Sequence, residues 1–285
     1  IFTDTPFEVF HSIVSAGGIV NALNVKGHSA DYSRKKIEAL EAEGKQFGCK
    51  RLSYLKMENG SYSGNVFKSL SQEECAKITE RLNVEDGDMV LIIADEKAVA
   101  QTSLGAIRKK LGRDLGLIGE GYKFLWVTDF PMFEYSKDEQ RWVAAHHPFT
   151  APNPEDVDKL QSDPEHCYSR AYDLVLNGYE LLSGSIRIHN RDLQEKVFEA
   201  IGLTPEEARS KFGFFLDAFK YGAPPHGGVG IGLERLVMIM AKTENIRDVV
   251  AFPKTNSASE LMSDCPHEVP EKSLRDLHIQ IARKS

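Results

Sequence analysis

Three glycines at every second position stand directly before an acid and an arginine, in the run Gly228-Val229-Gly230-Ile231-Gly232-Leu233-Glu234-Arg235. Because side chains alternate along a strand, this spacing predicts a strand with one bare face. Glycine in a strand often marks the close approach of a ligand, and a flat nucleotide base fits such a floor. The apolar run Leu233–Lys242 predicts a helix with Glu234 and Arg235 at its N-terminus, where phosphate is favoured. A glycine strand packed tightly under a helix, with Arg235 at the surface, is the simpler alternative.

Two carboxylates are predicted to share one face of a hairpin. Asn177-Gly178 is a strong two-residue turn signal, and it pairs Val175 with Glu180. Asp173 lies on the same face as Val175, which makes Asp173 and Glu180 diagonal neighbours at about 7–8 Å. Carboxylates at that separation can share a magnesium ion that carries nucleotide phosphates. Two solvent-facing acids at a hairpin edge are the alternative.

An arginine follows further along the second strand of this hairpin, in the run Ser183-Gly184-Ser185-Ile186-Arg187. Strict alternation places Arg187 on the face opposite Glu180. A bulge at Ser183-Gly184-Ser185 would bring both residues to one pocket. Since Ile186 and Ile188 flank Arg187, its guanidinium is expected to be partly buried and must find an anion. That anion is either a ligand or a local acid in a structural ion pair.

Two adjacent histidines, His146 and His147, end a predicted strand. They point to opposite faces, so at most one of them serves any given site. No further ligands stand at usable spacing, which argues against a metal pair. A hydrogen-bonded structural histidine is the alternative for each.

Composition bounds the class of protein. The chain has 285 residues, a net charge of −7, 41% hydrophobic and 27% charged residues, as in ordinary globular proteins. Its four cysteines lie far apart, which indicates reduced thiols in a cytoplasmic protein. No apolar run reaches the roughly 18 residues of a membrane span. Because the chain opens at Ile1 without a methionine, we expect a piece of a longer protein.

Strands and helices alternate over residues 1–122, and they predict an α+β domain. Its expected strands are 18–25, 52–57 and 89–94, and its expected helices are 34–43, 71–83 and 96–111, with Gly44 and Gly112 as stops. Basic clusters at 34–36 and 108–110 lie on these helices. They are interpreted as solvated faces, with a contact to RNA phosphate as the alternative.

Antiparallel strands dominate residues 123–285, which predicts a second α+β domain. Strands are expected at 123–128 and 141–145, before the hairpin and the glycine strand. The proline-rich, acidic stretch 151–166 is interpreted as an excursion or lid. Two helices are expected at 205–211 and 214–221.

The glycine run and the apolar helix after it resemble the third signature motif of class II aminoacyl-tRNA synthetases. Further blocks resemble the bacterial aspartyl-tRNA synthetase family, and residues 1–122 are similar to its GAD insertion domain. These blocks are His146-His147-Pro148-Phe149-Thr150, Tyr172–Glu180, Gly184–Asn190 and Ala251-Phe252-Pro253-Lys254-Thr255.

The resemblance implies a role for each candidate residue. Arg187 would bind the side-chain carboxylate of L-aspartate, with His146, Gly184 and Ser185 beside the amino acid. Glu180 would face ATP and Mg2+, assisted by Asp173. The ATP-binding set would be Gly232, Leu233, Glu234 and Arg235, with Arg235 on the phosphates. Glu180 and Arg235 would thus be the catalytic residues.

The family reaction forms aspartyl-adenylate and then transfers aspartate to tRNA(Asp), in a cytoplasmic homodimer. The first and second signature motifs and the anticodon-binding domain, which precede the insertion domain in the family, are not in this sequence, so we expect the 285 residues alone to be inactive. The alternative is a non-catalytic protein that binds tRNA or a protein partner, or a GAD-containing subunit of an amidotransferase.

Overall fold

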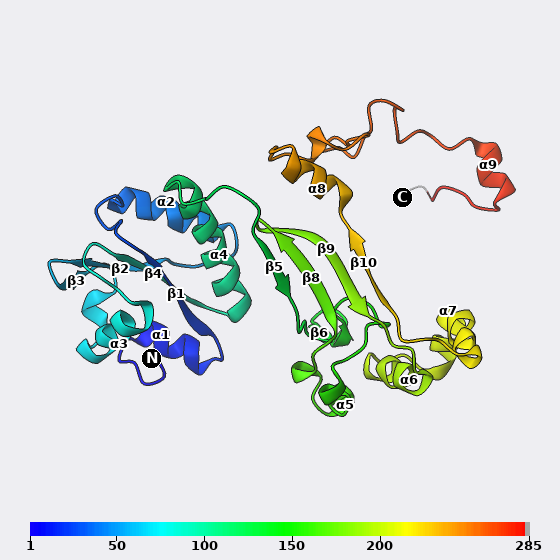
Figure 1. Cartoon of the computed structure of the whole chain (residues 1–285), viewed down its shortest axis with the longest axis horizontal. Helices are drawn as coiled ribbons and strands as arrows, with labels where there is room; N and C mark the ends of the chain where they lie inside the picture. The colour runs from blue at the N-terminus through cyan, green and yellow to red at the C-terminus, as the bar shows by residue number, and fades with distance from the viewer. Residues whose placement is uncertain (283–285) are drawn as a thin grey trace. The chain divides into compact units, whose positions relative to one another are not determined.

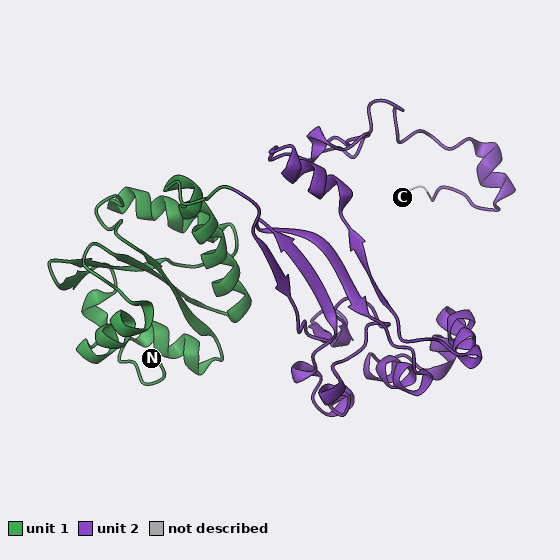
Figure 2. Ribbon diagram, viewed as in Figure 1, with its two compact units in different colours: residues 1–120 green, residues 121–285 purple. Residues whose placement is uncertain are grey.

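The computed structural model describes residues 1–282. It divides into two compact units, Ile1–Glu120 and Gly121–Ser285 (Figure 2). Both combine helices with antiparallel sheet, which confirms the predicted α+β class.

Unit 1 is built on a four-stranded sheet in the order β1-β4-β2-β3, with helices on both faces (Figure 1). Its central strand β4 alternates between two cores. Leu91 and Ile93 pack with helices α2 and α4, whereas Val90 and Ile92 pack with α1 and α3. The elements are α1 (Glu8–Ser15), β1 (Ile19–Val25), α2 (Arg34–Lys45), β2 (Ser53–Glu58), β3 (Ser61–Ser63), η1 (Phe67–Ser69), α3 (Gln72–Leu82), β4 (Met89–Asp95) and α4 (Lys97–Asp114).

Local capping and turn signals set the ends of several elements in unit 1. Ser33 caps α2, and Ser71 opens α3 with a complete capping box. The turn at Asn59-Gly60 has positive φ at both residues, 52° and 71°, as a type I′ hairpin turn requires.

The prediction that glycines stop two helices is wrong. Gly44 lies within α2, and Gly112 within α4. A helical glycine costs only about 1 kcal/mol, which tertiary packing can offset. At Gly44 the packing is close, because a Cβ there would lie 3.2 Å from Ile107 Cδ1. Helix α1 was not predicted.

Unit 2 is built on a second antiparallel sheet, in the order β10-β9-β8-β5, beside a two-stranded β6-β7 ribbon. The strands are β5 (Phe124–Val127), β6 (Phe133–Ser136), β7 (Arg141–Ala144), β8 (Ala171–Leu176), β9 (Tyr179–Ile186) and β10 (Gly227–Ile231). The helices are η2 (Pro154–Asp156), α5 (Lys159–Ser162), η3 (Pro164–His166), α6 (Arg191–Ala200), α7 (Pro205–Ala218), η4 (Phe219–Tyr221), α8 (Leu233–Met240), η5 (Ile246–Asp248) and α9 (Glu271–Asp276).

The structure of unit 2 differs from the prediction at three places. The two helices predicted at 205–211 and 214–221 are largely one helix, α7, which continues through Gly213. Helix α6 and strand β6 were not predicted. The stretch 151–166 is not a loose excursion: it forms short helices, and its Leu160 is buried at 2% exposure in the core of the unit.

No helix within residues 1–282 combines the length and the apolar character that a membrane crossing needs.

Candidate active site

The hairpin β8-β9 pairs as predicted at its turn, and it contains a bulge that resets the alternation. Val175 lies opposite Glu180, but Leu174 lies opposite Leu182, so Leu181 is the extra residue. The predicted bulge therefore exists. Its predicted place at Ser183-Gly184-Ser185 is wrong by a short step, since it falls at Leu181.

The bulge brings the polar candidates to one face of the sheet, which we call the site face. Asp173 pairs with Ser183, and Ala171 pairs with Ser185. Residues directly opposite each other on paired strands share a face, so Asp173, Ser185 and Glu180 lie on the same side. Arg187 follows Ser185 by two residues and continues in this phase.

Two of the alternating glycines leave the site face open. Gly228 pairs with Ser185 and Gly230 with Ser183, so both belong to it. A Cβ at Gly228 would meet nothing within 4 Å, and one at Gly230 would meet only a backbone oxygen at 4.0 Å. The bare strand face expected from the sequence is therefore present beside the carboxylates.

Gly184 belongs to the opposite face. It pairs with Tyr172 on one side and Val229 on the other. A Cβ at Gly184 would lie 2.7 Å from Tyr172 Cε2 and 2.9 Å from Val229 Cγ1. The glycine is thus needed for strand packing, and the structure gives it no place on the site face.

The guanidinium of Arg187 meets a histidine, not a carboxylate. Its Nη1 lies 2.9 Å from His147 Nδ1 and also contacts Nε2. Burial first, and then the charge of Arg187, lower the pKa of His147 from its usual 6.5. A neutral imidazole nitrogen can accept a hydrogen bond from Arg187. The other N–H groups of the Arg187 guanidinium remain available to bind an anion.

His146 takes a different environment from His147. Its ring packs edge-on against Phe130, with ring centroids 5.0 Å apart. The two histidine rings therefore point to different surroundings, as predicted for adjacent residues. The sequence motifs predicted His146 at the site but not the contact between His147 and Arg187. Arg187 itself was the available signal, because a partly buried arginine needs a hydrogen-bond partner.

Glu180 and Arg235 hold each other. Arg235 Nη1 donates to the Glu180 carbonyl at 2.6 Å and lies 3.3 Å from its carboxylate Oε1. Both side chains are about half exposed, at 51% and 44%. Gly232 caps α8, and its N–H donates to Leu181 O at 2.9 Å. Leu233 and Glu234 form the first turn, so the helix N-terminus and Arg235 meet the hairpin at the bulge.

Two polar atoms of the site face are buried without a partner in the described part of the chain. They are Asp173 Oδ1 and Ser185 Oγ. Buried polar groups normally make hydrogen bonds, so a ligand or water is expected there. Within residues 1–282 no cluster of three or more metal-binding side chains occurs. A magnesium ion on Asp173 and Glu180 would need phosphate oxygens and water to complete its shell, as Mg2+ commonly does.

Comparisons with known proteins identify the family. The profile described as "tRNA synthetases class II (D, K and N)" matches residues 32–256. The chain is 50% identical over 276 residues to the "Aspartate--tRNA ligase" of Macrococcus caseolyticus, covering 96% of this chain and 47% of the relative. It is also 50% identical over 285 residues to the "Aspartate--tRNA(Asp/Asn) ligase" of Bacillus subtilis, covering 100% of this chain and 48% of the relative.

Solved structures match less closely. An aspartyl-tRNA synthetase from Entamoeba histolytica is 19% identical, with a TM-score of 0.36 over 76% of this chain and 51% of that one. An asparaginyl-tRNA synthetase from Pyrococcus horikoshii is 26% identical, with a TM-score of 0.34 over 47% of this chain and 27% of that one. The chain belongs to the class II tRNA synthetases of the D, K and N group, on the sequence matches. It spans about half the length of the curated relatives that it matches.

Proposed function

We propose that this chain is the C-terminal part of an aspartate–tRNA ligase. In this proposal it supplies one side of the site that activates L-aspartate with ATP and then transfers it to tRNA(Asp). The observation that carries the proposal is the site face. There one bulge aligns the half-buried Asp173, which has one oxygen without a partner, with the Arg187 guanidinium and an open glycine floor. The curated relatives with aspartate–tRNA ligase names support it across the chain.

Arg187 is the proposed carboxylate receptor. Its contact with His147 holds one nitrogen of the guanidinium, and Thr150 pairs with its backbone. A guanidinium fixed in this way presents its remaining donors to the side-chain carboxylate of aspartate as a bidentate pair. Ser185 and His146 are proposed beside the amino acid. Asparagine lacks the negative charge, so this contact favours aspartate.

The other end of the site face is proposed to bind Mg·ATP. The base would lie over Gly228 and Gly230, and Arg235 would reach the phosphates from the first turn of α8. Arg235 keeps its bond to the Glu180 carbonyl and exchanges the carboxylate for phosphate oxygens. That exchange frees the Glu180 carboxylate for Mg2+, together with Asp173. Charge neutralisation and positioning then supply most of the catalysis.

We further propose that unit 1 is the GAD insertion domain and that the complete protein is a cytoplasmic homodimer. The names of the relatives include both "Aspartate--tRNA ligase" and "Aspartate--tRNA(Asp/Asn) ligase", so charging of tRNA(Asp) and of tRNA(Asn) by the extended chain are measured side by side.

The test is aspartate-dependent exchange of pyrophosphate into ATP. It uses the 285-residue chain and the same chain extended upstream to the length of its relatives. We expect exchange with aspartate only from the extended chain, and none with asparagine, glutamate or lysine. Exchange by the 285 residues alone would refute the proposal that they supply only one side of the site. No exchange by a folded extended chain would favour a protein that only binds tRNA or a partner.

Arg187→Ala in the extended chain gives the sharper test. We expect loss of aspartate-dependent exchange with ATP binding retained. Arg191→Ala is the matched control, because Arg191 is a nearby exposed arginine that pairs with Glu195 at 2.8 Å. An unchanged KM for aspartate and an unchanged kcat in Arg187→Ala would remove Arg187 from the site.

A further inference from the structure

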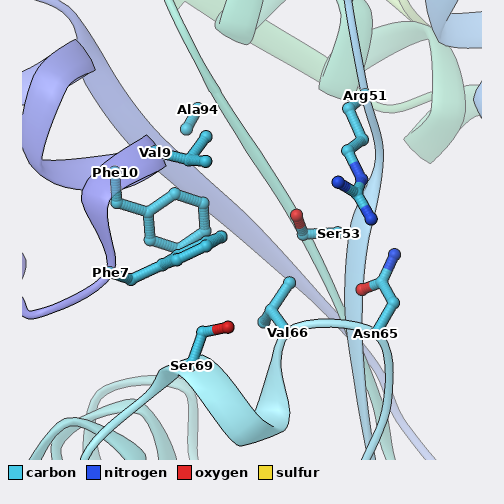
Figure 3. Close-up of a pocket in the computed structure, with 9 residues that line it drawn as sticks. All are labelled: Phe7, Val9, Phe10, Arg51, Ser53, Asn65, Val66, Ser69 and Ala94. Atoms are coloured by element: carbon cyan, nitrogen blue, oxygen red, sulfur yellow. The ribbon is translucent and has the colours of Figure 1, made fainter.

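Unit 1 contains a cavity of about 210 Å³, well within Ile1–Glu120 and remote in sequence from the residues of the site face. It lies between the start of α1, the start of β2 and the segment that leads into η1 (Figure 3). Its wall is divided by chemistry: one side is apolar and the other carries a cation and hydroxyls. The residues that matter here are Phe7, Phe10, Val66, Arg51, Ser53 and Ser69.

The apolar side is rigid. The rings of Phe7 and Phe10 pack edge-to-face, with centroids 4.7 Å apart and an interplanar angle of 61°. Phe10 and Val66 are buried at 1% and 2% exposure, and both are held in the core cluster that packs on this face of the sheet. Such a wall accepts an apolar group at the cost of little rearrangement.

The polar side is organised by β2. Arg51 precedes Ser53 by two residues, so both are aligned along the same side of the extended backbone. In Figure 3 the Arg51 guanidinium lies near Ser53, across the cavity from the two phenylalanines, and the Ser69 hydroxyl points in from η1. Asn65 is fixed beside them, since its amide accepts from Tyr54 N at 2.8 Å and donates to Leu52 O at 3.1 Å.

Apart from Asn65, the polar side chains of this wall are not used within the described part of the chain. Across residues 1–282, the guanidinium of Arg51 and the hydroxyls of Ser53 and Ser69 take part in none of the hydrogen bonds or ion pairs. Neither nearby acid forms an ion pair with Arg51 within the described residues. Glu41 binds Lys45 at 2.5 Å and the Leu52 N–H at 3.1 Å. Asp95 Oδ1 accepts from Glu96 N at 3.0 Å and lies 3.6 Å from Lys50.

We propose that this cavity binds a small carboxylate that carries one ring-sized apolar group. A cavity of about 150 Å³ holds benzene, so 210 Å³ accommodates a ring and a short acidic arm. The ring packs against Phe7 and Phe10, and the carboxylate takes the Arg51 fork and the serine hydroxyls. A nucleotide is too large, because drug-sized ligands need about 300 Å³ or more. The same chemistry is offered by a free acid and by the C-terminal residue of a peptide.

The experiment is a titration of the ¹⁵N-labelled 285-residue chain, followed by NMR through the backbone amides of Ser53 and Ser69. The probes are 3-phenylpropionate, its neutral analogue 3-phenylpropanol, and acetate. We expect saturable shifts with 3-phenylpropionate and at least about tenfold weaker binding of the other two. N-acetyl-glycyl-phenylalanine, beside its C-terminal amide, tests the peptide source: if it binds more tightly than 3-phenylpropionate, the ligand is a chain terminus, and otherwise it is a free acid.

Two variants and a control separate binding from folding. Arg51→Met should weaken 3-phenylpropionate about tenfold or more, and Val9→Trp should block it by filling the space. Val9 lines the cavity and is 47% exposed, so the larger side chain does not disturb a core. Lys68→Met removes a neighbouring charge that does not line the cavity and should bind as the parent chain does. Absence of saturable binding below about 10 mM, equal binding of the neutral alcohol, or an unaltered affinity in Arg51→Met would overturn the proposal.

Discussion

Gly184→Ala is expected to destabilise unit 2 through the joint between β9 and β10. An added Cβ would lie within 3.0 Å of two side chains, Tyr172 and Val229, and closer still to the carbonyl oxygen of Gly228. Carbon atoms pack best at about 3.5–4.0 Å. The nearest atom belongs to the backbone of the paired strand, so a side-chain rotation cannot relieve the clash and β10 must shift.

The magnitude follows from this geometry. Overpacking costs typically about 1–3 kcal/mol, and a clash against backbone belongs at the upper end. For a domain of this size, about 1 kcal/mol corresponds to a change of about 2–4 °C in Tm. We therefore expect the Tm of unit 2 to fall by about 6–12 °C. Calorimetry of the 285-residue chain measures it, with the transition of unit 1 as an internal reference.

Gly228→Ala is the matched control, one strand away. A Cβ there meets nothing within 4 Å, so the Tm should stay within about 2 °C of the parent chain. The methyl group would instead occupy the proposed nucleotide floor, and in the extended chain the KM for ATP should rise about tenfold. A parent-like Tm in Gly184→Ala, or an equal loss of Tm in both variants, would refute the assignment of the two glycines to opposite faces.

Three further predictions test other groups. Because the pKa of His147 is lowered, the stabilisation from its neutral form is complete above pH 6.5 and is lost as the pH falls through the lowered value. The Tm of the parent chain, measured from about pH 7 down to pH 5, should therefore fall, and His147→Asn should remove this slope. An equal slope in both chains would contradict this. Glu180→Gln should change Tm by less than about 4 °C, since half-exposed pairs contribute about 1 kcal/mol or less, yet weaken Mg·ATP binding measured by calorimetry; a large loss of Tm would mark the pair as structural. Ser71→Ala should cost unit 1 about 1 kcal/mol in a urea melt, through loss of the capping box, whereas an unaltered midpoint would show that the cap contributes little.

Local rules accounted for much of the fold. The capping box at Ser71 and the turns at Asn59 and Asn177 depend on residues only a few positions apart, so the sequence alone contains the whole cause. The continuation of α2 past Gly44 and of α4 past Gly112 could not be predicted in this way. Whether a glycine ends a helix depends on the contacts that continuing the helix would make, and those come from distant residues.

The candidate site was predictable in its residue types and less so in its contacts. The bare floor at Gly228 and Gly230 followed from period-two alternation and is open in the structure. The contact between Arg187 and His147 joins positions 40 residues apart, and no local spacing announces it. Gly184 was grouped with Ser185 through the resemblance, but adjacent strand residues face opposite sides, and its neighbours Tyr172 and Val229 place it away from the site face.

The position of the bulge has a cause that the sequence does contain. Leu181 and Leu182 are consecutive apolar residues, and they break the alternation of β9. Leu181 packs in one buried cluster with Met238 and Ile239 of α8, while Leu182 pairs with Leu174, which packs against the same cluster. One strand can turn two consecutive side chains to the same side only by inserting a residue. Leu181 and Leu182 therefore both face the side on which α8 packs, which places the bulge at Leu181, and the bulge shifts Arg187 onto the face of Glu180.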